Sequence, residues 1–143
     1  KAASHKIRLA ANQARFKVGD RLVITCQVDR EGYLNILNLG PGDRRPVVLF
    51  PNRLHPDNRV FPGQQITIPA PGDGFRLTAK PPRGRNLVVV FHTRENINAF
   101  RDGQGSPKDL FKTLSVQLAR GFVVEQEERG DYFGAGMVQV VIE

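Results

Sequence analysis

The sequence predicts a mainly β domain, a β-sandwich or partly open barrel of seven to nine short strands with one amphipathic helix in its C-terminal half. Two observations favour this class. The chain has 14 Gly and 10 Pro in 143 residues, with no Trp and one Met, a composition that suits short strands and tight turns. Its apolar runs are brief and stop at Pro, Gly or Asn, as in Leu49-Phe50-Pro51-Asn52. A chain of this length buries about two-thirds of its unfolded surface, so we expect one domain over residues 1–143, cut from a longer protein.

The first strands follow from alternation of apolar residues. Residues 5–10 place Ile7 and Leu9 on one face of a short strand. In residues 21–28, every second residue falls on one face of the strand, a repeat that is typical of a half-buried strand. These residues are Leu22, Ile24, Cys26 and Val28. The polar turn at 29–32 then predicts that residues 33–39 return as the hairpin partner of 21–28.

The middle of the chain reads as strands interrupted by proline. We expect strands over 46–50, ended by Pro51, over 64–68, ended by Pro69, and over 75–79. Residues 52–61 carry two more prolines and alternating charges, and read as a loop. The unbroken apolar run at 87–91 predicts that 86–93 is a central strand covered on both faces.

A helix is expected near the C-terminus. Ser106-Pro107-Lys108-Asp109 has a capping serine, a proline at the first helical position and an acid at the third. An apolar stripe of Leu110, Leu114 and Leu118 follows, and Gly121 supplies the stop. We expect this helix to pack on the sheet and strands over 122–126 and 136–142 to close the fold.

The formal net charge is +7 and is carried mostly by arginine. Most arginines are scattered singly, and local clusters occur only at Arg44-Arg45 and Arg83-Gly84-Arg85. A generally basic, solvated surface, a phosphate-binding patch and a site for an acidic protein partner all remain open. No stretch approaches the roughly 20 apolar residues that cross a bilayer, so no membrane span is expected.

No catalytic constellation is found. Cys26 shares the apolar face of its strand, which favours a buried structural thiol over a nucleophile. His5, His55 and His92 lack the spacing of metal ligands, the carboxylates fall at turns, and the glycine-rich turns lead into strands instead of helices. Tyr33 and Phe50 could stack on bases or sugars but fit core positions better. We therefore expect no catalytic residue, no cofactor and no metal, with structural roles for Cys26, Tyr33, Phe50, Pro51 and Asn52.

A set of motifs occurs in order along residues 16–93 and resembles the bacterial domain-of-unknown-function family numbered 4384. The resemblance implies an accessory β-rich module, usually one domain of a larger bacterial protein that also carries caspase-like peptidase, kinase or envelope lipoprotein parts. No catalytic residues are established for that module, so none are carried over. Arg85-Asn86 and the long 96–106 loop depart from the usual pattern. The motifs are Phe16-Lys17-Val18-Gly19-Asp20, Gly32-Tyr33-Leu34, Leu49-Phe50-Pro51-Asn52, Ile68-Pro69, Gly74-Phe75 and Pro81-Pro82-Arg83-Gly84.

These observations lead to a non-catalytic protein-binding or assembly module of a bacterial envelope or secreted protein, periplasmic or extracellular. Its expected partner is another bacterial protein or the rest of its own parent chain, engaged through loops at one end of the sandwich. The alternative is a polyanion- or ligand-binding domain that uses Arg44, Arg45, Arg83 and Arg85. An enzyme, or an accessory domain of a peptidase, ranks third.

Overall fold

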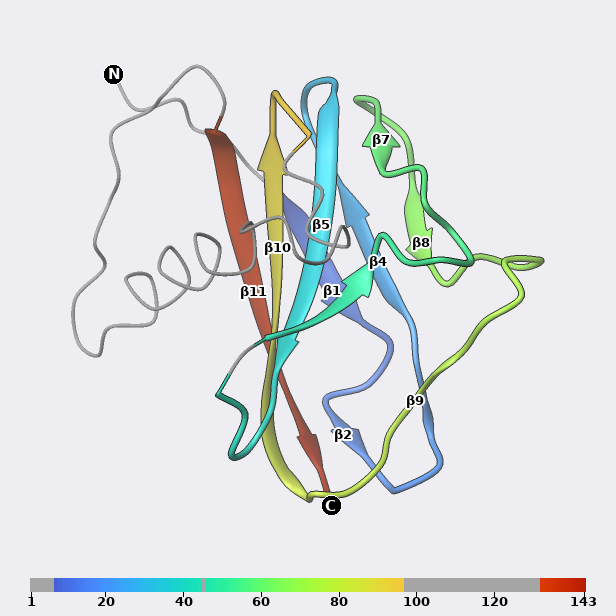
Figure 1. Ribbon diagram of the computed structural model, residues 1–143, viewed down its shortest axis with the longest axis vertical. Helices are drawn as coiled ribbons and strands as arrows, with labels where there is room; N and C mark the ends of the chain where they lie inside the picture. Colours follow the sequence, from blue (N-terminus) through green and yellow to red (C-terminus); the bar gives the residue numbers. More distant parts are fainter. Residues whose placement is uncertain (1–6, 45, 97–131) are drawn as a thin grey trace.

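The computed structural model describes residues 7–44, 46–96 and 132–143, and within them it contains eleven strands in three open sheets (Figure 1). The predicted mainly β class is confirmed. The strands outnumber the seven to nine expected, because several are only two residues long. The described ranges contain no helix, and the helix predicted from Ser106 onward and the strand predicted at 122–126 lie outside them.

The largest sheet has six strands in the order β2-β11-β10-β5-β6, with β7 also paired to β5. All its pairs are antiparallel except β2 with β11. The apolar run at 87–91 lies in β10, between β5 and β11, so the prediction of a central strand is confirmed. The strands are β2 (Arg15–Phe16), β5 (Gly32–Leu39), β6 (Val47–Phe50), β7 (Arg59–Val60), β10 (Gly84–Thr93) and β11 (Tyr132–Ile142).

Two smaller sheets complete the described part of the chain. One has three antiparallel strands in the order β1-β4-β8, and the other is the two-stranded ribbon β3-β9. Both β6 and β8 end immediately before a proline, since proline has no N–H to donate to the ladder. The strands are β1 (Arg8–Ala11), β3 (Arg21–Leu22), β4 (Ile24–Gln27), β8 (Ile66–Ile68) and β9 (Leu77–Thr78).

The main core lies between the three-stranded sheet and one face of the six-stranded sheet. Alternate residues of β4 and β8 point inward and meet alternate residues of β5 and β10. Each fully buried aliphatic or aromatic side chain of this kind stabilises the fold by roughly 1.5–3 kcal/mol. The buried members are Ile24, Cys26, Val28, Leu34, Ile36, Phe50, Val60, Ile66, Ile68, Val88 and Val90.

The opposite face of the six-stranded sheet holds a second cluster. Leu37 of β5 and Val89 and Phe91 of β10 are each at most 1% exposed. β10 is buried on both faces, so apolar residues follow one another along it. In β4 only one face is buried, so apolar and polar residues alternate.

The predicted hairpin of 21–28 with 33–39 is wrong. β4 pairs with β1 and β8, whereas β5 pairs with β6, β7 and β10 in the other sheet. The 29–32 turn therefore carries the chain across the core, and the two strands face each other through side chains. The physical reason is burial: residues on both faces of β5 are buried, so it takes a central place in the larger sheet.

Two other expectations need correction. Residues 21–28 form two strands, because the chain changes partners at Val23, whose N–H donates to the Asn12 side chain (2.8 Å). Residues 52–61 contain β7 as well as loop, and the buried Asn58 fixes that segment to the sheet. Its side chain donates to the Leu34 carbonyl (3.0 Å), and its own carbonyl accepts from the Leu34 N–H (2.9 Å).

Candidate functional site

One end of the molecule carries a cavity of about 490 Å³, which we call the end groove. There the β5–β6 loop, the β9–β10 loop and Glu143 gather (Figure 1). The β3-β9 ribbon forms one wall of the groove, and the end of the six-stranded sheet forms the opposite wall. The lining residues are Phe16, Leu22, Asn38, Gly40, Pro41, Asp43, Val47, Leu49, Arg76, Leu77, Thr78, Ala79, Lys80, Pro81, Pro82, Asn86, Val140 and Ile142.

The sheet wall of the groove is polar at one place. Asn38 of β5 and Asn86 of β10 lie on the core-facing side of their strands, beyond the last apolar residues of the main core. Asn38 Nδ2 donates to Asn86 Oδ1 (3.0 Å), and Asn86 Nδ2 donates to the Gly84 carbonyl (3.2 Å). A Cβ at Gly40 would lie 2.7 Å from Asn86 Oδ1, so only glycine fits there without a shift. Asn86 is 6% exposed, whereas Asn38 is only half-buried.

Prolines stiffen the rim. Pro41 stands in the β5–β6 loop, and Pro81 and Pro82, joined by a cis peptide bond, stand in the β9–β10 loop. The two loops touch: a Cβ built on Gly84 would lie 2.9 Å from Pro41 Cγ, and Gly84 has a φ of +134° that other residues rarely adopt. The rim is therefore held in one shape by fixed proline φ angles and this close contact.

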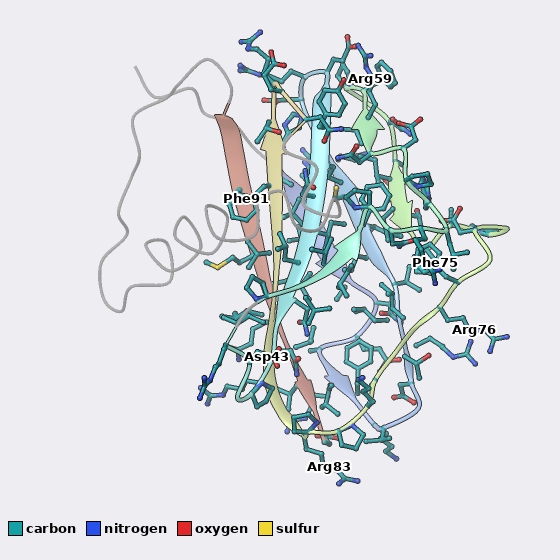
Figure 2. All side chains as sticks on the ribbon, viewed as in Figure 1. Asp43, Arg59, Phe75, Arg76, Arg83 and Phe91 are labelled. Carbon is teal, nitrogen blue, oxygen red and sulfur yellow. The ribbon has the colours of Figure 1, made fainter. Side chains whose placement is uncertain are left out.

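Among the described residues, three charged side chains line the groove: Asp43, Arg76 and Lys80. The Asp43 carboxylate accepts a hydrogen bond from the Gly40 N–H (2.7 Å) and so stabilises the turn at residues 40–43. Arg76 extends from the molecule into solvent (Figure 2), and Lys80 is exposed.

Of the four arginines predicted to bind a partner, the three that the structure describes do not share one face of the molecule. Arg83 donates through Nε to the carbonyl of Glu143 (2.9 Å) at the groove end (Figure 2). Arg44 is exposed in the neighbouring loop, which the Pro41–Gly84 contact brings close. Successive side chains of a strand point to opposite faces of the sheet. Asn86 lines the groove, so its neighbour Arg85 lies on the other face. Arg45 lies outside the described residues.

The motif Leu49-Phe50-Pro51-Asn52 forms a closed turn. Phe50 is 2% exposed and belongs to the main core, and the Phe50–Pro51 peptide is cis. Asn52 Nδ2 donates to the Leu49 carbonyl (2.9 Å), and Asn52 Oδ1 accepts from the N–H groups of Leu54 (2.9 Å) and His55 (3.0 Å). These contacts are internal to the loop and suit the structural role predicted for Pro51 and Asn52.

His55 meets Asp73, a pairing that the sequence reasoning missed. His55 Nδ1 lies 3.1 Å from Asp73 Oδ2, and the same oxygen accepts from the Ala70 N–H (2.8 Å). The Ala70 hydrogen bond is the largest effect on the pKa of Asp73 and lowers it; burial opposes this, and the His55 contact lowers the pKa further. The His55 ring also packs edge-on against Phe50, with centroids 4.9 Å apart. The two residues are 18 positions apart, so no spacing rule could have paired them.

Four turns share one backbone conformation and one set of hydrogen bonds, and their sequences are similar. Each has glycine at the third position with φ between +76° and +100°, and the fourth residue donates its N–H to the carbonyl of the first. The side chain of the fourth residue also accepts from the N–H of the first. Glycine at this position permits the type II turn. The turns are Lys17-Val18-Gly19-Asp20, Gly40-Pro41-Gly42-Asp43, Phe61-Pro62-Gly63-Gln64 and Ala70-Pro71-Gly72-Asp73.

Cys26 and Tyr33 lie away from the groove. Cys26 is 3% exposed in the main core, and burial raises the pKa of its thiol to about 12, which leaves it protonated and unreactive at neutral pH. Tyr33 is half-buried and lies under Arg59, whose guanidinium carbon is 5.8 Å from the ring centroid and which also pairs with Glu31. Arg59 and Arg83 stand at opposite ends of the molecule (Figure 2).

Among residues 7–44, 46–96 and 132–143, no three His, Cys, Asp or Glu side chains come together as metal ligands. The same residues include no helix long and apolar enough to cross a bilayer.

Comparison with known families gives one result. The family model described as "Domain of unknown function (DUF4384)" matches residues 15–96. The chain belongs to this family. The DUF4384 segment includes most of the groove-lining residues and the Asn52 turn. No curated protein sequence and no solved structure matches the chain.

Proposed function

We propose that this DUF4384 domain is a non-catalytic protein-binding module that holds a segment of its partner in the end groove. The observation that carries the proposal is the groove itself, about 490 Å³ in volume with mainly apolar walls and a small polar site at Asn38 and Asn86. Binding sites are characteristically concave and apolar with a few placed polar groups. The volume lies within the range of roughly 300–1,000 Å³ that is typical of ligand pockets.

The absence of catalysis is part of the proposal. Histidine and carboxylate side chains are the usual acid–base groups, and the structure holds one close pair of them, within its described ranges, in His55 and Asp73. Both side chains join turns, and the pair lies outside the groove lining. The raised pKa of Cys26 supports the same conclusion for the single thiol.

We further infer a β-sandwich rather than a partly open barrel. Three sheets with unclosed strand order, two of them enclosing one core cluster, favour the sandwich. We place the domain in a larger bacterial envelope or secreted protein, in the periplasm or outside the cell. This follows from what the family resemblance implies, and the partner is then another bacterial protein or the parent chain.

A polyanion-binding role is the second candidate. The Pro41–Gly84 contact favours it, because the contact brings the loops of Arg44 and Arg83 together at one end. Three observations rank it lower: Arg83 is bonded to Glu143, Arg85 lies on the other face, and the carboxylates of Asp43 and Glu143 stand in the same region. Such neighbours reduce the local positive potential.

The test is selection from a displayed library of random 12-residue peptides. We expect peptides enriched on the wild-type domain to bind Val18→Arg equally and to lose binding to Val47→Arg. Val47 lines the groove and is 54% exposed, whereas Val18 is 42% exposed and does not line it, so the two variants add the same charge at similar exposure. Enriched peptides that bind Val47→Arg as well as wild type, or a selection that enriches none, would refute a groove-based binding function.

A further inference from the structure

The structure assigns a partner chemistry to the end groove: an acidic peptide segment that places one bulky apolar residue between the sheet and the β3-β9 ribbon and a carboxylate at the rim. This inference rests on the proposed protein-binding function and adds the class of sequence that is bound. It follows from three features of the groove, which concern its walls, its polar site and its rim charges.

The walls of the groove favour an apolar residue on the bound peptide. Leu22 and Leu77, paired across the ribbon, face the groove from one side, and Val47, Leu49 and Ile142 line it from the sheet. Leu22, Leu49 and Leu77 are only partly buried, although they pack at the border of the main core. An apolar side chain seated among them removes further apolar surface from water, at roughly 25 cal/mol per Å².

The polar site suits a peptide main chain. Asn38 uses one N–H to reach Asn86 Oδ1, and its side chain is half-buried at the groove surface. The second N–H and the oxygen of a primary amide are a donor and an acceptor, the complement of a backbone C=O and N–H. An extended segment crossing this point can make both bonds while its side chain enters the apolar part.

The charged side chains at the rim favour a negative charge on the bound peptide. Among the described residues of the lining, Lys80 and Arg76 are exposed cations and Asp43 is the one anion, so the lining keeps more positive than negative charge. The cations therefore favour a carboxylate on the bound chain, and the basic balance of the whole sequence, +7, steers acidic segments in the same sense.

A nucleic acid fits the groove less well than a peptide. Single-stranded nucleic acids are held by exposed aromatic rings on which bases stack, together with a track of cations. Phe16, the one aromatic residue of the lining within the described ranges, is 2% exposed. The apolar walls would also have no counterpart on a phosphate backbone.

The experiment is the same peptide selection, run in parallel on the wild type, on Arg76→Glu/Lys80→Glu and on a control, Arg8→Glu/Arg53→Glu. The control reverses two exposed arginines that do not line the groove, so its net charge matches that of the test variant. We expect acidic peptides from the wild type and the control, and neutral or basic peptides from the test variant. The affinity of a wild-type-selected peptide for the test variant, measured by fluorescence polarisation, should fall roughly tenfold, the effect of two exposed charge contacts reversed in sign.

Two outcomes would overturn the inference, and they differ from the failure of the proposed function. Peptides that require Val47 but show the same charge preference on all three proteins would leave the groove a binding site and remove its preference for acids. Equal weakening in the test variant and the control would assign the effect to net charge instead of the rim. Replacing Asn38 by Leu, which keeps the side-chain size, should weaken the same peptide further, and unchanged affinity would overturn the main-chain contact.

Discussion

Asp73 holds two partners with one oxygen: its Oδ2 accepts from the Ala70 N–H within its own turn and lies 3.1 Å from His55 Nδ1, which belongs to the turn after β6. The contact joins two loops that flank the main core, because Phe50 at the end of β6 and Ile68 at the end of β8 are both core residues. The pair is therefore placed to affect the stability of the fold.

Acid should destabilise the domain partly through Asp73. Its pKa is lowered in the folded protein, first by the Ala70 N–H and then by His55, so its contribution is present above the unfolded pKa of about 3.9 and is lost as pH falls through the lower folded value. We expect the melting temperature of wild type to drop more steeply below pH 4 than that of Asp73→Asn. Asp29→Asn, at an exposed turn, is the control and should follow wild type.

The thiol of Cys26 should react only after denaturation. It is 3% exposed, and its raised pKa keeps it protonated. A thiol reagent at pH 8 should label the native protein far more slowly than the protein in denaturant. Cys26→Ala should lower the free energy of unfolding by about 1–2 kcal/mol through a small cavity. Rapid labelling of the native protein would contradict the core position.

Asn52 should stabilise the fold through its amide. Asn52→Val removes three hydrogen bonds and should cost about 1–3 kcal/mol of unfolding free energy. Asn52→Asp keeps an oxygen for the Leu54 and His55 N–H groups and loses only the donor to Leu49, so it should cost less. Chemical denaturation measures both. Peptide binding should survive in both variants, and its loss at unchanged stability would make this turn part of a recognition site.

Gly84 should tolerate substitution poorly. Gly84→Ala adds the strain of a positive φ and a methyl group 2.9 Å from Pro41 Cγ, whereas Gly19→Ala adds strain at φ +100° with open space around it. We expect a loss of roughly 1–3 kcal/mol for Gly84→Ala and a smaller loss for Gly19→Ala. Equal losses would show that the loop contact contributes nothing.

Binding to heparin or nucleic acid should be weak and should fall steeply as salt rises, because each neutralised anionic group releases counterions. Replacing Arg44, Arg45, Arg83 and Arg85 by Glu should abolish it and leave the fold intact, since the described members of this set are exposed. Titration at two salt concentrations measures this. Tight binding that persists near physiological salt and disappears in the variant would promote the polyanion function above the peptide function.

Local patterns predicted the strands well and their partners poorly. The alternation at Ile24, Cys26 and Val28 and the continuous run in β10 identified which residues are buried, because burial depends on the period of the strand itself. The partner of β5 depends on which sheet can cover both of its faces, a tertiary property. A polar turn at 29–32 serves a hairpin and a crossing between sheets equally well, so the sequence could not distinguish them.

The candidate site was only partly predictable. Arg44 and Arg83 were correctly placed in loops. The strand was expected to begin at residue 86, whereas β10 begins at Gly84, so Arg85 lies in the strand, on the face opposite Asn86. The groove itself requires the β3-β9 ribbon, whose strands are two residues long and carry almost no periodic signal. The Gly-Asp ending shared by three of the four turns was visible in the sequence and would have predicted their common geometry.

The pairing of β10 with β11 has a practical consequence for anyone who trims this protein to its family match. β11 and β1 lie beyond residues 15–96, yet β11 pairs with β10 from Gly84 to Thr93 and β1 pairs with β4 from Arg8 to Ala11. A fragment limited to the matched residues would expose the backbone of a long apolar strand along one side, an aggregation-prone arrangement. The unit recognised by sequence comparison is therefore shorter than the unit that should be expressed, and a fragment ending at Asn96 should be less soluble than the full chain.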